Sequence, residues 1–321
     1  MKILSANVYT NHPHVFTFSD NVKQFIVGFS SIDVHYSEID HHVRDIEIDL
    51  QNVQKSDNYV TVTPVVRMSD RHDTSESYYS TINVAVIALV GEGNPDIYML
   101  NRVKVNENFE LPWDNLTFIQ SSLTHNYVSY WETDHHLEKY YSLTYPKSSN
   151  SPFMLQGETF MTDRHYRNLR GAVSADVIAY CGIDKKVLCC SFNSNNSGRK
   201  GSVCFGEKPR NFKPDDYELA CIINGYEVSF KTSTDHHVYQ IKLSSKIEND
   251  KLYEKDGKVY ANINLTAYLE DSSKNCTDIQ HNKLYGFVIA YNKNKPEEKQ
   301  YNNYEEFADE YNKINSSFLN Q

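Results

Sequence analysis

The first half of this 321-residue chain contains no cysteine, and no part of it contains a Cys-x-x-Cys pair. Disulfides that stabilised the whole fold would be needed in the N-terminal part as well. The pattern therefore favours scattered buried thiols in a reducing compartment. The six cysteines are Cys181, Cys189, Cys190, Cys204, Cys221 and Cys276.

A positively charged stripe and a long apolar run are also missing. The net charge of −10 argues against a protein that binds a nucleic-acid backbone. No apolar run approaches the roughly 18–20 residues that span a bilayer, so no membrane span is predicted. Polar residues begin at Ser5, so we expect no signal peptide and synthesis in the cytoplasm, with any export by a non-classical route.

The sequence shows no nucleophile–base pair, no phosphate-binding loop and no paired carboxylates of the glycosidase type. A non-enzymatic protein without a cofactor is therefore predicted.

What the chain does have is aromatic residues, at 13% with 24 Tyr, which favour pleated half-buried surfaces over long helices. Apolar and polar residues alternate with period two between turn residues, which is typical of an antiparallel sandwich. In the first ninety residues this pattern predicts six strands: ILSANVYT, HVFTF, QFIVGFSSIDVHYS (with a bend or bulge at Ser30-Ser31), HVRDIEIDL, YVTVTPVVRM and TINVAVIALV.

The tripeptide Asp-His-His occurs three times, at spacings of roughly 100 residues, after a strand-like run each time. Met68-Ser69-Asp70-Arg71-His72 in the first copy is matched by Met161-Thr162-Asp163-Arg164-His165 in the second, and Leu269-Glu270-Asp271-Ser272 lies at the comparable place in the third. One structural unit is thus used three times. The three copies begin at Asp40, Asp134 and Asp235.

The predicted fold is therefore all-β, with three tandem six-stranded antiparallel β-sandwiches and a short C-terminal helix. We place the repeats at residues 1–93, 94–185 and 186–293, and a helical tail with an apolar stripe at 294–321. The charged stretch SKIENDKLYEKDGK in the third repeat is predicted to be a surface hairpin loop.

Each repeat is expected to gather polar residues at one end of its sandwich. Asp-His-His opens the fourth strand and the Asp-Arg-His segment closes the fifth, so a hairpin would bring them together. Neighbouring histidines in a strand point to opposite faces, so His41 and His42 should not chelate one ion together. Three interpretations remain open: a structural hydrogen-bond network, a glycan site, and a divalent metal site.

The stretches FTFSDNVKQFIVGFSSIDVHYSEIDHHVRDIEID and YVTVTPVVRMSDRHDTSESYYSTINVAVIAL resemble the H-type lectin domain of discoidins and snail agglutinins. The resemblance covers the first repeat best, the second fairly and the third weakly. That family is a six-stranded β-sandwich that forms trimers and binds GalNAc or galactose near protomer interfaces.

The resemblance implies positions for a sugar site. The family's arginine at the start of the fourth strand falls on His42, and its aromatic-His pair falls on Arg71-His72. A family tyrosine corresponds to Tyr78 or Tyr79. With the repeat carried over, the predicted ligand-binding residues are His42, Asp70, Arg71, His72, Tyr79, His136, Asp163, Arg164, His165 and His237.

The predicted function is carbohydrate binding through repeated weak sites, with glycans of the GalNAc or galactose type as partners. The family's trimers imply either three repeats packed as a pseudo-trimer within one chain or a chain that itself forms a homo-oligomer, such as a trimer. The alternative is a structural, self-assembling protein, a component of a shell, appendage, injection device or inclusion, that docks through its C-terminal helix.

Overall fold

A computed structural model describes residues 1–36, 41–70, 80–131, 134–147, 152–163, 169–194, 199–230, 236–273 and 282–294. The described residues form antiparallel strands and one short 3-10 turn, Pro214–Asp216, with no α-helix among them. The predicted all-β class is confirmed. The helix predicted over 294–321 lies, apart from its first residue, outside the described residues.

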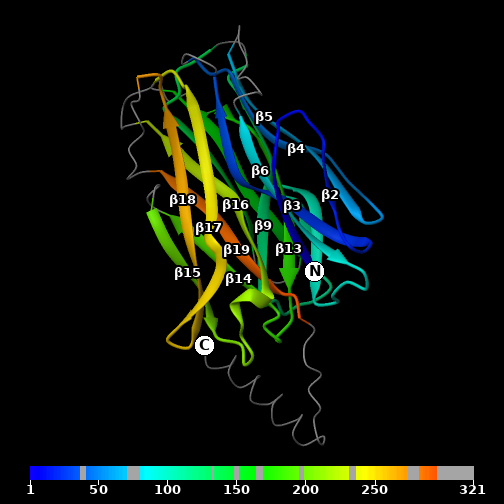
Figure 1. Cartoon of the computed structure of the whole chain (residues 1–321). Coiled ribbons are helices and arrows are strands. Elements are labelled where there is room, and N and C mark those ends of the chain that lie inside the picture. Colours follow the sequence, from blue (N-terminus) through cyan, green and yellow to red (C-terminus); the bar gives the residue numbers. More distant parts are fainter. Residues whose placement is uncertain are drawn as a thin grey trace, which may run out of the picture.

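The strands form three sheets, and Figure 1 shows the long strands running side by side along the molecule. Sheet I has the order β1 (Lys2–Val8), β6 (Thr81–Val90), β3 (Val22–His35), β17 (Gln240–Lys255), β18 (Lys258–Glu270), β15 (Arg199–Glu207). Sheet II has the order β2 (His14–Thr17), β5 (Tyr59–Ser69), β4 (Asp45–Ser56), β9 (Phe118–Ser129), β13 (Ala172–Tyr180), β7 (Ile97–Lys104). Sheet III has the order β12 (Leu169–Arg170), β11 (Phe153–Thr162), β10 (Lys139–Lys147), β16 (Tyr217–Ser229), β19 (Lys283–Asn292), β14 (Val187–Ser194), with β8 (Asn108–Phe109) beside β11.

Every sheet joins two repeats, because each repeat divides its strands between two sheets. Repeat 1 places β1, β6 and β3 in sheet I and β4, β5 and β2 in sheet II. Repeats 2 and 3 follow the same rule, so the third strand of one repeat always pairs with the fourth strand of the preceding one. One of the two arrangements expected above, three repeats packed around one axis within a single chain, is therefore present.

The three joints between repeats have the same register. Asp45 pairs with Ser129, Lys139 with Ser229, and Gln240 with His35. The first residue of each pair begins the fourth strand of its repeat, and its partner ends the third strand of the neighbouring repeat. The shared register relates the three repeats by a pseudo-threefold axis.

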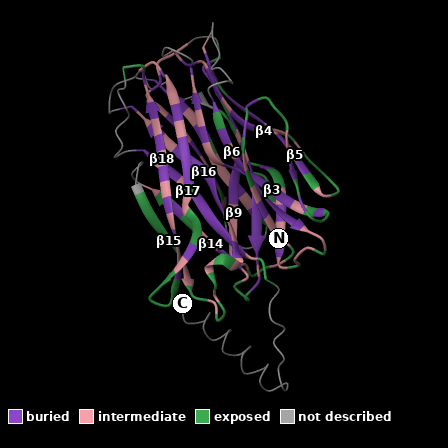
Figure 2. Ribbon diagram, viewed as in Figure 1, coloured by how far each residue is buried: buried purple, intermediate pink, exposed green. Residues whose placement is uncertain are grey.

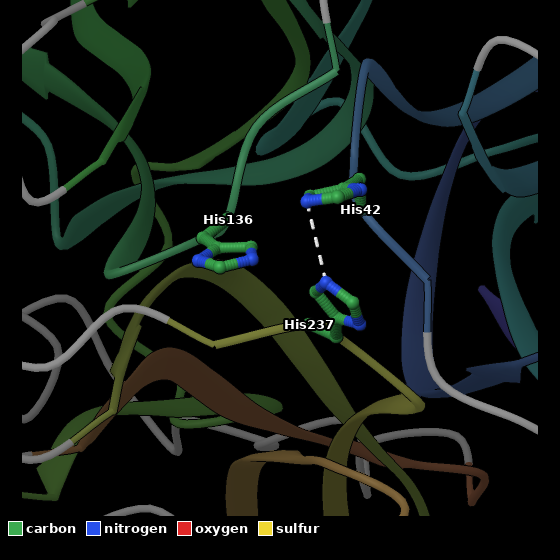
Figure 3. A group of neighbouring side chains, drawn as sticks. All are labelled: His42, His136 and His237. Carbon is green, nitrogen blue, oxygen red and sulfur yellow. Dashed lines mark hydrogen bonds between the residues drawn. The ribbon is translucent and has the colours of Figure 1, made fainter.

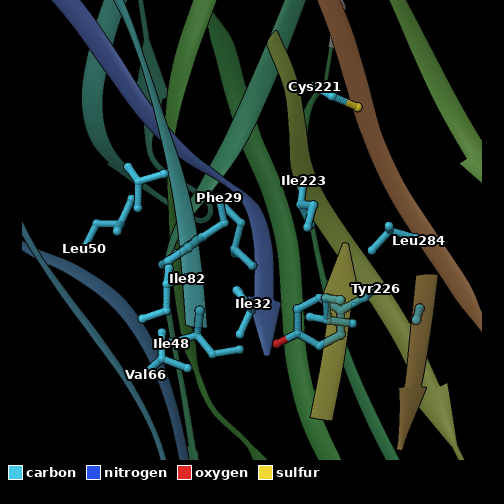
Figure 4. Packing of buried hydrophobic residues seen from close by; sticks show 14 of the residues in the cluster. Phe29, Ile32, Ile48, Leu50, Val66, Ile82, Cys221, Ile223, Tyr226 and Leu284 are labelled. Atoms are coloured by element: carbon cyan, nitrogen blue, oxygen red, sulfur yellow. The ribbon is translucent and has the colours of Figure 1, made fainter. Parts of the chain in front are cut away.

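The hydrophobic core lies between the two layers of each repeat and continues across the joints. In repeat 1, Phe29 and Ile82 on sheet I pack in one cluster with Ile48 and Val66 on sheet II (Figure 4). All four are at most 1% exposed, and full burial of such a side chain stabilises a fold by about 1.5–3 kcal/mol. Figure 2 shows buried residues along the inner strands and an exposed edge strand β15.

The third strands of the three repeats meet closely near the axis. A Cβ atom on Gly28 would lie 2.7 Å from Ile222 Cγ2 and 2.9 Å from Ser122 Cβ. Ser122 Oγ also donates a 2.6 Å hydrogen bond to the carbonyl oxygen of Val27. The three repeats thus contribute residues of different size to one tight contact.

Asp176 fixes a second contact between repeats 1 and 2. Its fully buried carboxylate accepts hydrogen bonds from the backbone N–H groups of Val27 and Arg102 and from the side-chain amide of Asn101. Burial raises the pKa of Asp176 to about 6, and these hydrogen bonds oppose that rise. A buried acid with three donors is a specific link between β13, β7 and β3.

Two local predictions have different outcomes. The bulge predicted at Ser30-Ser31 is confirmed, since the β3–β6 register shifts between Phe29 and Ser31. The surface loop predicted for the charged stretch of repeat 3 is wrong, because β17 continues to Lys255 and the turn is only Asp256-Gly257. Ile247 and Leu252 pair with β18 across a register shift, while the charged side chains between them face solvent.

Candidate functional site

The three His-His segments close a ring around the pseudo-threefold axis. His41 exchanges backbone hydrogen bonds with Val238, His135 with Val43, and His236 with Leu137, at N–O distances of 2.8–3.2 Å. Each segment has three residues, two histidines and the apolar residue that follows them. The first histidine of each segment therefore pairs with the apolar third residue of a segment from another repeat. The third residues, Val43, Leu137 and Val238, are fully buried.

The second histidines of all three segments, His42, His136 and His237, meet at the centre of the ring (Figure 3). Each offers one nitrogen, and these nitrogens lie within 4.8 Å of one another. The Nε2 atoms of His42 and His237 are 3.2 Å apart. The ring centroids of His42 and His136 are 4.7 Å apart and nearly parallel, whereas the ring of His237 stands edge-on to both.

The first histidine of each segment points away from this cluster, as alternation in an extended chain predicts. His41 Nδ1 lies 3.0 Å from Asp70 Oδ2, His135 Nδ1 lies 3.0 Å from Asp163 Oδ2, and His236 Nδ1 lies 3.3 Å from Asp271 Oδ2. Each of these imidazoles also packs against an aromatic ring. The three rings belong to Tyr36, Tyr130 and Phe230, with centroids 4.3–4.9 Å from the imidazole.

The electrostatic environment lowers the pKa of His42 and so favours its neutral form. Burial is the largest cause that lowers the pKa of His42, and the nearby His237 lowers it further. The carboxylates of Asp134 and Asp70 act in the opposite direction. A 3.2 Å contact between two Nε2 atoms needs one donor and one acceptor, which also requires at least one neutral ring.

A second polar cluster lies at the joint between repeats 1 and 2. Asp45 accepts hydrogen bonds from Arg44 Nε at 2.7 Å, Ser69 Oγ at 3.0 Å and Tyr127 OH at 3.2 Å. Burial would raise the pKa of Asp45, but hydrogen bonds from Ser129, Arg44 and Ser69 lower it below its ordinary value. Asp45 is thus a fixed anion, and the side chain of Arg44 next to it is 31% exposed.

Trp131 follows directly after this joint and is unusual in two respects. It is among the most exposed large hydrophobic residues described, at 78%. Its backbone has φ of 65°, a region that bulky residues rarely adopt, and its N–H donates to Ser129 Oγ. The preceding Tyr130 donates its N–H to the carbonyl oxygen of Arg44 at 2.8 Å, so Trp131 begins beside the Arg44–Asp45 cluster.

The equivalent joints carry different charges. Between repeats 2 and 3, Glu227 contacts Lys139 at 2.7 Å and Lys283 at 3.0 Å. Between repeats 3 and 1, Lys242 Nζ lies 2.6 Å from Asp33. The backbone geometry is repeated at the three joints, but the chemistry of the surface is not.

The predicted site residues separate into groups. His42, His136 and His237 come together on the axis, while Asp70 and Asp163 lie in two of the three separate Asp–His pairs, beside His41 and His135. Arg71, His72, Tyr79, Arg164 and His165 lie outside the described residues. The sequence interpretation grouped both histidines of a repeat with its own acids and did not anticipate that three repeats would share one histidine cluster.

The sequence interpretation also missed Arg44, Asp45 and Trp131. Their one visible signal was position: Trp131 ends an apolar strand just before the second Asp-His-His, and Arg44-Asp45 follows the first. Their proximity depends on pairing between strands of different repeats, which the pattern of a single strand does not contain.

Comparison with protein-family models, curated proteins and solved structures gave no match. Within the part of the chain that the structure describes, no helix is long and apolar enough to cross a membrane.

Proposed function

We propose that this chain is a non-enzymatic carbohydrate-binding protein with its main sugar site at the joint between repeats 1 and 2. The observation that carries this proposal is Trp131, an exposed residue in a strained backbone conformation that directly follows the backbone contact between Tyr130 and Arg44. Residues held in sparsely populated backbone conformations cluster at binding and active sites, and an exposed aromatic ring is available to a ligand.

The residue types suit a sugar. An aromatic face packs against the C–H face of a pyranose, and fixed charged or hydroxyl groups bind its hydroxyls. Tyr127, at 37% exposure, adds a second partly exposed ring with its hydroxyl already oriented toward Asp45. The cluster therefore offers donors and an acceptor that lose little freedom on binding.

The sequence resemblance supports the same place. H-type lectins bind GalNAc or galactose near protomer interfaces, and here a joint between repeats takes the place of such an interface. Ser69, which donates to Asp45, directly precedes Asp70, Arg71 and His72, three of the residues that the resemblance assigns to sugar binding.

The joints should not bind equally. Tyr36, Tyr130 and Phe230 occupy equivalent positions, and the residues that follow them are Ser37, Trp131 and Lys231. Because only the second has an indole, we expect the joint between repeats 1 and 2 to supply most of the affinity. The other two would then add weak contacts through avidity.

A glycan array tests this proposal. The wild-type chain should bind glycans that end in GalNAc or galactose, and Trp131→Ala should weaken binding by about tenfold, or roughly 1.4 kcal/mol. Tyr9→Ala is the matched control, because Tyr9 is a 66% exposed aromatic residue that the proposal places outside the site. The double variant His72→Ala/His165→Ala tests the residues assigned by resemblance.

Failure of the wild-type chain to bind any glycan would remove the proposal. The remaining alternative is a self-assembling structural protein. The exposed edge strand β15 favours it, since an edge strand presents unpaired backbone groups to another chain. Light scattering with and without residues 294–321 would measure that association directly.

A further inference from the structure

We propose that His42, His136 and His237 bind one divalent transition-metal ion, with Zn²⁺ the best match, on the pseudo-threefold axis. Each repeat contributes one imidazole, from the second position of its His-His pair. Three imidazoles and one open position form a known arrangement for zinc, and imidazole also suits Cu²⁺ and Ni²⁺.

The distances are close to those that coordination needs. With Zn–N bonds of about 2.0–2.1 Å, two nitrogens of a tetrahedral site lie roughly 3.3 Å apart. The Nε2 atoms of His42 and His237 are already 3.2 Å apart, and no pair of donor atoms in the cluster exceeds 4.8 Å. Small rotations about the side-chain torsions, mainly of His136, would bring all three nitrogens to one ion.

The backbone around the cluster is fixed before any ion binds. Six backbone hydrogen bonds close the ring of segments that carries the three imidazoles, and the residue after each of them is fully buried. Little backbone entropy is therefore lost on coordination. A preorganised donor set of this kind raises affinity, because the ordering cost has already been met by folding.

The nearby charges complement a cation. The carboxylates of Asp134 and Asp70 both act electrostatically on His42. Asp134 Oδ1 is buried and has no hydrogen-bond partner within the described part of the chain. A divalent ion held by His42 would compensate this carboxylate, because an uncompensated buried charge is costly.

All three histidines are partly exposed, so water or a solvent-derived ligand can reach the fourth coordination position. The ion would link one residue from each repeat and therefore oppose separation of the three His-His segments. Its expected role is structural: it adds its binding free energy to the stability of the folded chain.

Metal titration of the full-length chain, prepared without a polyhistidine tag and treated with a chelator, tests the proposal. Calorimetry should show one Zn²⁺ bound per chain, with a rise in the melting temperature. His42→Ala should lose affinity at least about 100-fold and show no such rise. His12→Ala is the matched control, because His12 is exposed outside the cluster, and it should bind like the wild type.

Two further measurements keep the result decisive if a variant folds poorly. Far-UV circular dichroism checks the fold of each variant, and X-ray absorption of the wild-type Zn²⁺ complex counts its imidazole ligands. Three imidazoles and one ion per chain support the proposal. No stoichiometric binding, fewer than three imidazoles, or equal affinity in a folded His42→Ala variant would overturn it.

Discussion

The two histidines of each His-His pair have different surroundings because consecutive side chains of an extended segment point to opposite sides. The first histidine reaches an aspartate of its own repeat, as His41 reaches Asp70. The second reaches the axis and meets the other repeats. A shift of one position would exchange these roles and bring the Asp-facing residues to the centre.

Gly28 is a residue whose size is set by its pseudo-threefold equivalents. Gly28→Ala places a methyl group against Ile222 and Ser122, both fully buried, so we expect a loss of about 1–3 kcal/mol in unfolding free energy. Urea denaturation measures it. In a double-mutant cycle, Gly28→Ala should cost less in an Ile222→Ala background, because the nearer of the two colliding groups, Ile222 Cγ2, is gone. Strict additivity would contradict a direct contact at the axis.

At the scale of elements, long strands extend beyond the joints and end in tight turns. β17 and β18 are connected by Asp256-Gly257, with φ of 51° and 74°. This two-residue connection with positive φ at both positions matches the right-handed twist of a hairpin. The turn, rather than the charged residues before it, determines where β17 ends.

A comparison of Gly257 with Gly201 measures the cost of a side chain at positive φ, because only Gly257 has a positive φ. Gly257→Ala puts a side chain at φ of 74° with no atom within 4 Å, so it should destabilise the chain by about 1 kcal/mol through backbone strain alone. Gly201→Ala, in the edge strand β15, meets only Ile263 at 3.9 Å and should be neutral or stabilising by up to about 1 kcal/mol. Chemical denaturation compares the two. Equal effects would show that the positive φ is unimportant.

At the scale of the whole molecule, the three repeats depend on one another. Each repeat offers the edge of its third strand to one neighbour and the edge of its fourth strand to the other. Removal of any repeat would expose two rows of backbone hydrogen-bonding groups and the buried residues of both neighbours. The repeats are alike in strand order but are not independent in stability.

Calorimetry should therefore show one unfolding transition, with the calorimetric enthalpy close to the van't Hoff enthalpy. Independent modules would instead unfold in separate steps. A fragment of residues 1–93 serves as the comparison, and we expect it to lack a folded monomeric state because β3 and β4 would each lose the partner strand on one edge, β17 and β9. Two or three resolved transitions in the full chain, or a stable monomeric fragment, would contradict this view.

Much of the local structure was predictable from the sequence. The six strands of repeat 1 and the bulge at Ser30-Ser31 follow from period-two alternation, which depends only on neighbouring residues. The opposite directions of His41 and His42 follow from the same rule. The charged end of β17 was not predictable in this way, because its strand is defined by pairing with β18 and not by its own pattern.

The sequence by itself thus determined the all-β class, the threefold repeat and the sides to which the two histidines of a pair point. Tertiary structure alone decided that the fourth strand of each repeat pairs with the third strand of the next, which unites His42, His136 and His237 and places Trp131 beside Arg44. The physical reason is that strand alternation is a local property of the chain. Which strand edge meets which is settled by packing and backbone hydrogen bonds across residues far apart in sequence.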